Sequence, residues 1–334
     1  GSPTRMKRFK HILCVITTPT TGQALLERAT GLAEVNQARL TVATVAERIS
    51  IGMGMPDGGP ISDDLQAAVV ASAKRRLEEA IAPFRKRIKI ESRVLQGSLF
   101  LEVIREVLRD GHDLVIKSAE DPEWLDRLLG SEDMHLLRKC PCPVWLVKPG
   151  AARKHRSIVA AVDLDDAHEE SELQTRHRLN MDILEMASSL ALANFCELHV
   201  VHAWEVVGET SMRDGFIRLP EAKVDAYVHL VKRRRESAMA RLLEELNDQP
   251  GNGVLDCIEY TAHLVKGSPR KIIPSVARTV RADMVVMGTV ARTGVPGFIT
   301  GNTAEMILAQ IESSVLAIKP RGFRTPVTLE ARED

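Results

Sequence analysis

Short apolar runs alternate with longer amphipathic stretches along the 334 residues of this chain. Residues 12–16, 158–162 and 284–287 are runs without a polar interruption, and such runs indicate strands buried on both faces. The stretch 101–108 instead places apolar residues at the three- and four-residue spacing of a helix. Strands that alternate with helices predict an α/β fold with a parallel sheet, covered on both faces and joined by right-handed crossovers.

The same unit is written twice along the chain. Gly97 is followed by a helical pattern and then by Asp113 at the start of an apolar run, and Gly267 is followed in the same way by Asp283. Both intervals are 16 residues long (113 − 97 and 283 − 267). An internal match without gaps indicates a duplicated domain.

We therefore predict two tandem, open, five-stranded parallel α/β domains of the Rossmann-like type. The first copy covers residues 8–149, the second copy covers 155–320, and 321–334 is expected to be a flexible tail. The final strands, at 144–147 and 315–318, are apolar edge candidates, and unpaired edges recruit partners.

Composition narrows the functional classes. Lys+Arg 45 against Asp+Glu 45 gives a net charge of zero, so no specific nucleic-acid partner is predicted. No apolar run is long enough to cross a bilayer, so no membrane insertion is expected. Five cysteines, an odd number, argue against a disulfide framework and favour a reducing, cytoplasmic location.

Two further patterns, a close cysteine pair and a run of basic residues, are interpreted as structural features. The spacing in Cys140-Pro141-Cys142 is tighter than the usual zinc-binding pair and no second pair exists, so no metal site is predicted. The basic run from Lys232 to Arg235 lies in an amphipathic helical pattern and is expected to form a solvated face.

The most informative stretch runs from Ala282 to Glu305. An apolar strand, 284–287, is followed by glycines and then by Asn302-x-x-Glu305, a capping-box pattern that opens a helix. Glycines admit an anion close to backbone N–H groups, and a helix N-terminus favours negative charge, so this order predicts a phosphate cradle. A glycine-rich connection with nothing bound is the alternative.

These residues, together with the Gly-Ser before the third helix of each copy, resemble the universal stress protein family in its tandem form. The resemblance covers about 10–319 and implies an adenine nucleotide alpha hydrolase-like fold. Members that bind ATP carry glycine, two residues, glycine, nine residues, glycine and then Ser or Thr. The second copy has Gly288, Ala291, Gly301 and Asn302 at these positions. An alanine methyl group disfavours positive φ at the second position, and an amide replaces the hydroxyl at the last.

The resemblance implies a nucleotide site in the second copy. Its adenine and ribose side would consist of Asp163, His202 and Ala203. Its phosphate side would consist of Gly288, Ala291, Arg292, Gly301, Asn302 and Thr303. We expect Mg²⁺ there only together with ATP.

The first copy departs further from the family pattern. Glu132 and Asp133 begin its last helix, and several carboxylates near a triphosphate would repel it. The other departures are Thr17 and Thr18 after the first strand and Ser118 and Asp121 at the first two glycine positions. We predict that the first copy does not bind ATP.

The resulting functional hypothesis is a cytoplasmic stress-response protein, non-catalytic or regulatory, that binds ATP in the second copy only. No catalytic residue is assigned, because neither a P-loop nor the usual motifs of adenylating enzymes are present. The alternatives are an apolar small molecule or lipid in the clefts, or slow ATP hydrolysis. The resemblance also implies an internal pseudo-dimer through the final strands, and it leaves a homodimer open.

Overall fold

The computed structural model describes residues 9–49, 59–120, 131–151, 154–167, 169–249, 253–289 and 302–329. Strands and helices alternate through both copies, as the hydrophobic pattern predicts. The described chain divides into two compact units. One contains residues 9–151 and 312–329 and is called the first unit; the other contains 154–289 and 302–311 and is called the second unit.

The first unit holds a sheet in the order β3-β2-β1-β4-β5-β10. Its strands are β1 (His11–Val15), β2 (Arg39–Ala46), β3 (Ile90–Gln96), β4 (Leu114–Ser118), β5 (Val144–Val147) and β10 (Ser314–Ile318). Its helices are α1 (Pro19–Asn36), α3 (Pro60–Ile81), α4 (Leu99–Asp110) and α5 (Glu132–Lys139). Neighbouring strands from β3 to β5 are parallel.

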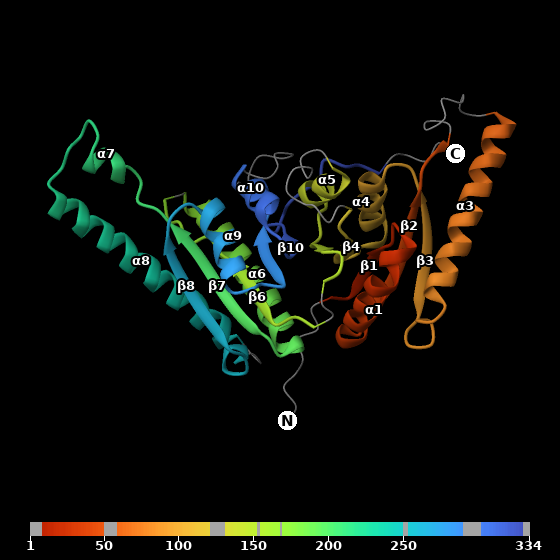
Figure 1. Ribbon diagram of the computed structural model, residues 1–334, viewed down its shortest axis with the longest axis horizontal. Coiled ribbons are helices and arrows are strands. Elements are labelled where there is room, and N and C mark those ends of the chain that lie inside the picture. The colour runs from red at the N-terminus through yellow and green to blue at the C-terminus, as the bar shows by residue number, and fades with distance from the viewer. Residues whose placement is uncertain are drawn as a thin grey trace. The chain divides into compact units, whose positions relative to one another are not determined.

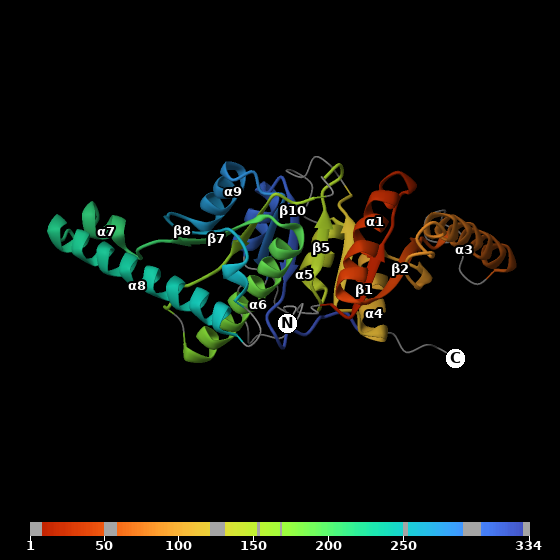
Figure 2. The same ribbon diagram turned by 90° about the horizontal axis from the view of Figure 1, so that it is seen from below.

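The second unit holds the parallel order β9-β6-β7-β8. Its strands are β6 (Ser157–Ala161), β7 (Glu197–Trp204), β8 (Tyr260–Lys266) and β9 (Met284–Gly288). Its helices are α6 (Glu170–Asn194), α7 (Glu209–Arg213), α8 (Glu221–Asp248), α9 (Pro269–Thr279) and α10 (Asn302–Gln310), with a 3₁₀ turn at Val254–Asp256. The short α7 lies beside α8, near the N-terminal end of that long helix (Figure 2).

Helix cover explains why the central strands are buried throughout and mostly apolar. Every residue of β1, β4 and β6 is buried. In the first unit α1 and α3 pack on β1, β2 and β3, with α3 alongside β3 in Figure 1. In the second unit α6 packs on β6, β7 and β9, while α9 packs on β7 and against α10. Both units therefore have the predicted α/β architecture.

The final strands of the two copies pair with each other. In the first unit β10 lies antiparallel to β5, with Leu316 opposite Trp145 and Ala317 opposite Val144. The Ser314 hydroxyl also accepts a hydrogen bond from the Lys148 amide at 3.0 Å. These two strands are the apolar edge candidates of the sequence, so each covers an edge that would otherwise stay unpaired.

The two aspartates that mark the repeat have the same structural task in both units. The Asp113 carboxylate accepts from the amides of Lys10 and His11 at 2.7 and 3.0 Å, just where β1 begins. The Asp283 carboxylate accepts from the amides of residues 156 and 157 at 2.5 and 3.0 Å, at the start of β6. Asp113, just before β4, thus fixes the start of β1, which pairs with β4. Asp283, just before β9, likewise fixes the start of β6, which pairs with β9.

We expect Asp283→Ala to lower the free energy of unfolding by about 1–2 kcal/mol, because two amides at the start of β6 lose their acceptor. Asp283→Asn keeps one acceptor oxygen and should cost less. Urea unfolding followed by circular dichroism measures both. Equal stability of the alanine variant and the parent chain would contradict this role.

Candidate functional site

A cavity of about 490 Å³ opens at the carboxyl ends of β6 and β7 in the second unit. Ligands in open parallel sheets occupy this edge, because the loops that follow the strands converge there. The floor is formed by strand ends and the sides by α6, α8, α9 and the first turns of α10. The cavity therefore lies where the topology predicts a binding site.

Five of the residues predicted for the nucleotide site line this cavity together. They are Asp163, His202, Ala203, Gly288 and Thr303. Asn302 is the first residue of α10, and its side chain lies outside the described part of the structure. Ala291, Arg292 and Gly301 also lie outside the described residues.

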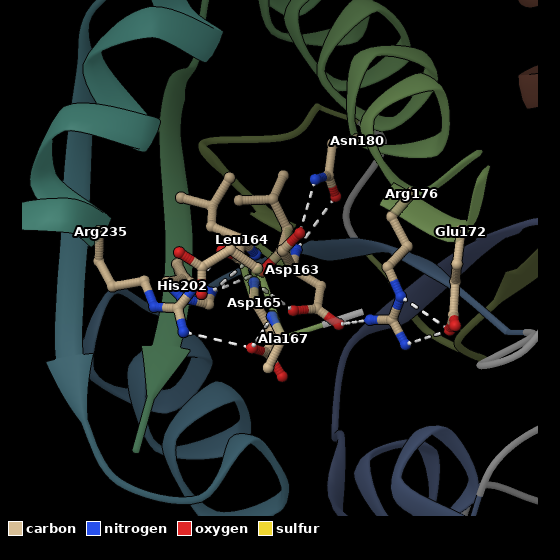
Figure 3. Close-up of polar contacts among 11 residues, drawn as sticks. Asp163, Leu164, Asp165, Ala167, Glu172, Arg176, Asn180, His202 and Arg235 are labelled. Atoms are coloured by element: carbon tan, nitrogen blue, oxygen red, sulfur yellow. Dashed lines mark hydrogen bonds and ion pairs between the residues drawn. The ribbon is translucent and has the colours of Figure 1, made fainter. Parts of the chain in front are cut away.

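The loop after β6 is held by a side chain of α6. The Asp163 amide donates to the Asn180 Oδ1 at 3.0 Å, and the Asn180 Nδ2 donates to the Asp163 carbonyl at 2.7 Å. This reciprocal pair fixes the backbone at the strand end. The Asp163 carboxylate accepts from the Asp165 amide at 3.0 Å and forms an ion pair with Arg176 of α6 (Figure 3).

Arg235 of α8 ties the same loop from the other side. Its guanidinium donates to the Leu164 carbonyl and to Asp165 Oδ1, the latter at 3.2 Å, and approaches Asp166 at 3.4 Å (Figure 3). Only 8% of this residue is exposed, so the expectation that 232–235 forms a solvated face is wrong at Arg235. The buried Met239, like Arg235, lies on the inner face of α8. The four-residue spacing from Arg235 to Met239 places both residues on one face of a helix, which indicates burial of Arg235. The run of basic residues from Lys232 to Arg235 made this spacing easy to overlook.

His202 combines deep burial with an unsatisfied nitrogen on the cavity wall. Its Nδ1 lies 3.3 Å from the Val162 carbonyl and 3.4 Å from the Leu164 amide. Its Nε2 is buried and has no hydrogen-bond partner among the described residues. Burial lowers the pKa of the imidazole, although the Asp163 charge opposes that shift. A neutral ring has one nitrogen that donates and one that accepts a hydrogen bond.

Comparisons with known proteins identify the family. The model of the universal stress protein family matches residues 8–148 and again 178–319. Universal stress protein E of Escherichia coli K12 is 34% identical over 237 residues, which cover 70% of this chain and 69% of that protein. Its namesake in Photorhabdus laumondii is 29% identical over 96% of this chain and 98% of its own length.

The chain belongs to the universal stress protein family. The two matches to the family model confirm the tandem arrangement. A solved structure of a putative universal stress protein from Pseudomonas aeruginosa has a TM-score of 0.66 and 25% identity, covering 94% of this chain and 95% of that one. A universal stress protein from Archaeoglobus fulgidus shares the fold, with a TM-score of 0.57 at 16% identity over 92% of this chain and 96% of that one.

The two universal-stress copies differ at the start of the last helix. Positions there correspond at an offset of 171 (301 − 130), so Asp133 of α5 matches Ala304 of α10. Asp133 is buried and pairs with Lys117 Nζ at 2.7 Å, while Lys117 itself has no exposed surface. Upstream, from Asp113 and Asp283, the offset is 170 (283 − 113), so Lys117 of β4 matches Met287 of β9. The first copy thus has a buried ion pair where the second has two apolar side chains.

Protein donors already surround the acidic residues of the first copy. The amide of Glu120 donates to Asp133 Oδ2 at 2.8 Å, and the Phe100 amide at the start of α4 donates to Glu132 Oε2 at 2.9 Å. The Ser131 hydroxyl accepts from the Met134 amide at 3.1 Å and caps α5. These carboxylates occupy donors that a phosphate would otherwise use. That the first copy does not bind ATP stays a prediction, and these contacts give a physical reason for it.

We expect Asp133→Ala to destabilise the chain by about 3–5 kcal/mol, because it removes the close partner of the buried Lys117 ammonium and leaves only the Glu120 carboxylate, 3.9 Å away. The double variant Lys117→Met with Asp133→Ala copies the residue pair of the second unit and should recover most of that loss. Urea unfolding of the two variants at pH 7 measures the difference. A double variant no more stable than the single one would show that the ion pair is not the cause.

Stability should fall as the pH drops below about 6.5, in part through His202. The pKa of His202 is lowered in the folded chain. As the pH falls, the unfolded chain therefore binds a proton before the folded chain does, and this binding favours the unfolded state. His202→Gln should therefore make the decline between pH 6.5 and about 5 shallower, as measured by urea unfolding at several pH values. An unchanged slope would contradict a neutral, buried His202.

Proposed function

We propose that this chain is a non-catalytic, regulatory stress-response protein whose second unit binds an adenine nucleotide in the cavity at the ends of β6 and β7. The observation that carries the proposal is the convergence of Asp163, His202, Gly288 and Thr303 on one cavity. These residues come from four separate places in the sequence, and the family resemblance assigns them to one nucleotide site.

The chemistry of the cavity fits the parts of a nucleotide. The unsatisfied His202 Nε2 and the neighbouring Ala203 suit a planar base, which needs one hydrogen bond and an apolar contact. Asp163 provides carboxylate oxygens for ribose hydroxyl groups. The first turn of α10, with Thr303, provides the end of a helix that favours phosphate. When bound, Mg²⁺ would screen the charge of the phosphates, and we expect it only with the nucleotide.

Arginine side chains offset most of the acidic charge that lines the cavity. Asp163 is paired with Arg176, and Asp165 and Asp166 are paired with Arg235. Two guanidinium groups thus offset two of the three carboxylate charges in the loop after β6. In the first copy, by contrast, Glu120 has a raised pKa because of burial and the neighbouring Asp133 charge, which reflects crowded carboxylates. The proposal accordingly confines nucleotide binding to the second unit.

An apolar ligand is the second candidate, favoured by the outer wall of the same cavity. That wall is formed by Val206, Val207, Tyr227 and Val231. Val207 is 88% exposed and Tyr227 46% exposed, so apolar surface continues from the cavity to the outside. A fatty-acyl chain would bury that surface, whereas a nucleotide would leave much of it exposed.

The test is titration calorimetry of the full chain with ATP and Mg²⁺. Thr303→Glu gives the second unit the acidic residue that the first copy has at Glu132, and it should weaken ATP binding at least about tenfold through charge repulsion. Thr303→Gln is the matched neutral control and should change affinity little. Equal affinity of the glutamate and glutamine variants would contradict phosphate binding at α10.

Native mass spectrometry of the purified chain separates the two candidates. An adenylate mass supports the nucleotide, and an acyl-chain mass together with no heat of binding at millimolar ATP supports the apolar ligand instead. ATP that binds but is not hydrolysed over hours supports a non-catalytic role. Steady hydrolysis that Thr303→Glu removes would overturn that part of the proposal.

A further inference from the structure

Cys140 and Cys142 form a pair of neighbouring buried thiols in the first unit. Their sulfur atoms lie 3.6 Å apart, Cys140 is fully buried and Cys142 is 7% exposed. Cys140 ends α5 in an extended conformation, and Pro141 then fixes the backbone that leads into β5. The two sulfur atoms therefore lie side by side, although only Pro141 separates the two cysteines along the chain.

The fold does not require this pair. At the offset of 171, the second copy has Ile311 and Ser313 in the corresponding positions before β10. An apolar residue and a hydroxyl can therefore occupy the same turn in the same fold. The two thiols occur at this turn in the first copy and not at the matching turn of the second, so the packing of the turn does not require them.

A buried lysine lies at the end of α5 that leads into the two thiols. Lys319, just after β10, is 6% exposed, and its Nζ donates to the Leu137 carbonyl at the end of α5. Among the described residues no carboxylate lies within salt-bridge distance of this ammonium group. Burial lowers the pKa of Lys319 to about 8, and the charges of Cys140 and Cys142 oppose that shift. The thiols are thus the groups that offer Lys319 a negative charge.

The surroundings make the two thiols unequal. Burial raises the pKa of Cys140, but the hydrogen bonds with Cys142 and the Lys319 charge outweigh it, and the net shift is downward. The pKa of Cys142 rises through its hydrogen bond to Cys140 and through burial, with Asp113 adding to the rise. Burial raises the pKa of the solitary Cys14, and burial together with the charges of Asp283 and Glu197 raises the pKa of Cys196. Cys140 is therefore the thiol most easily deprotonated in this pair.

We propose that Cys140 and Cys142 are a peroxide-oxidisable dithiol, in which Cys140 is the attacking thiolate, Cys142 the resolving thiol and Lys319 the cation that supports the thiolate. The Cys140 sulfur attacks one oxygen of hydrogen peroxide, forming an S–O bond as the O–O bond breaks. The departing hydroxide takes up a proton and becomes water.

The second step closes the disulfide. The Cys142 sulfur attacks the sulfenic sulfur of Cys140, an S–S bond forms, the S–O bond breaks, and the leaving hydroxide takes the Cys142 proton as water. Two thiols lose two electrons and two protons, and one peroxide becomes two waters. Because both thiols are buried, oxidation proceeds through local opening at this end of α5.

The experiment treats the full-length chain with hydrogen peroxide at pH 7.4, removes the oxidant, and unfolds the chain in iodoacetamide. The tryptic peptide that begins at Cys140 contains Cys142 and no other cysteine, so its mass reports this pair alone. We expect a product lighter by two hydrogens that carries no alkyl group, while the buried Cys14 and Cys196 are alkylated. Full alkylation of Cys140 and Cys142, with the exposed Cys257 oxidised in the same sample, would overturn the proposal.

Two variants test the assigned roles. In Cys142→Ser the sulfenic acid on Cys140 has no resolving thiol and should be trapped by dimedone; an adduct confined to Cys257 would refute Cys140 as the attacking group. Lys319→Met keeps an unbranched side chain, shorter by one atom, and removes its charge, and it should slow disulfide formation about tenfold, since the thiolate fraction falls. An unchanged rate in this variant, with its folding verified by circular dichroism, would refute the role of Lys319.

Discussion

Parallel strand pairing is the constraint on which the rest of this structure depends. A parallel neighbour can be reached only by a crossover, and the crossover helices cover both faces of the sheet. The central strands must therefore be apolar on both sides, and their carboxyl ends must meet at one edge. In the second unit that edge carries Val162, Asp163 and the end of β7, and the cavity lies there. The site follows from the topology before any particular side chain is considered.

The two copies show how this edge can be used differently. Met287 and Ala304 place apolar side chains where the first turn of α10 borders the cavity. In the first copy Lys117 and Asp133 form a buried ion pair, and the Asp133 carboxylate also accepts a hydrogen bond from the Glu120 amide. A buried ion pair contributes little net stability but is costly to break, so it fixes the helix start in one arrangement. The same fold thus supports an open cavity in one unit and an internally satisfied helix start in the other.

The sequence predicts the architecture well, because its signals are local and repeated. Apolar runs, helical spacing and the Gly-to-Asp intervals identify the strands, the duplication and the edge that carries the candidate site. It predicts less about Arg235 and Lys117, since charged residues are normally solvated. Lys117 continues the buried strand β4, and Arg235 falls on the apolar stripe of α8. In both cases position in the hydrophobic pattern is a better guide than residue type, because a partner opposite makes burial tolerable.

The cysteine pair illustrates a different limit. Cys140-Pro141-Cys142 is visible in the sequence, but Lys319 is far away along the chain and directly follows β10, the last strand of the second copy. Only the antiparallel pairing of β5 with β10 brings the end of β10 to α5, where Lys319 meets the Leu137 carbonyl. A duplicated gene can therefore give one copy a charged residue drawn from the other. Because the second copy has Ile311 and Ser313 at the matching positions, this chemistry arises once in the chain although the fold arises twice.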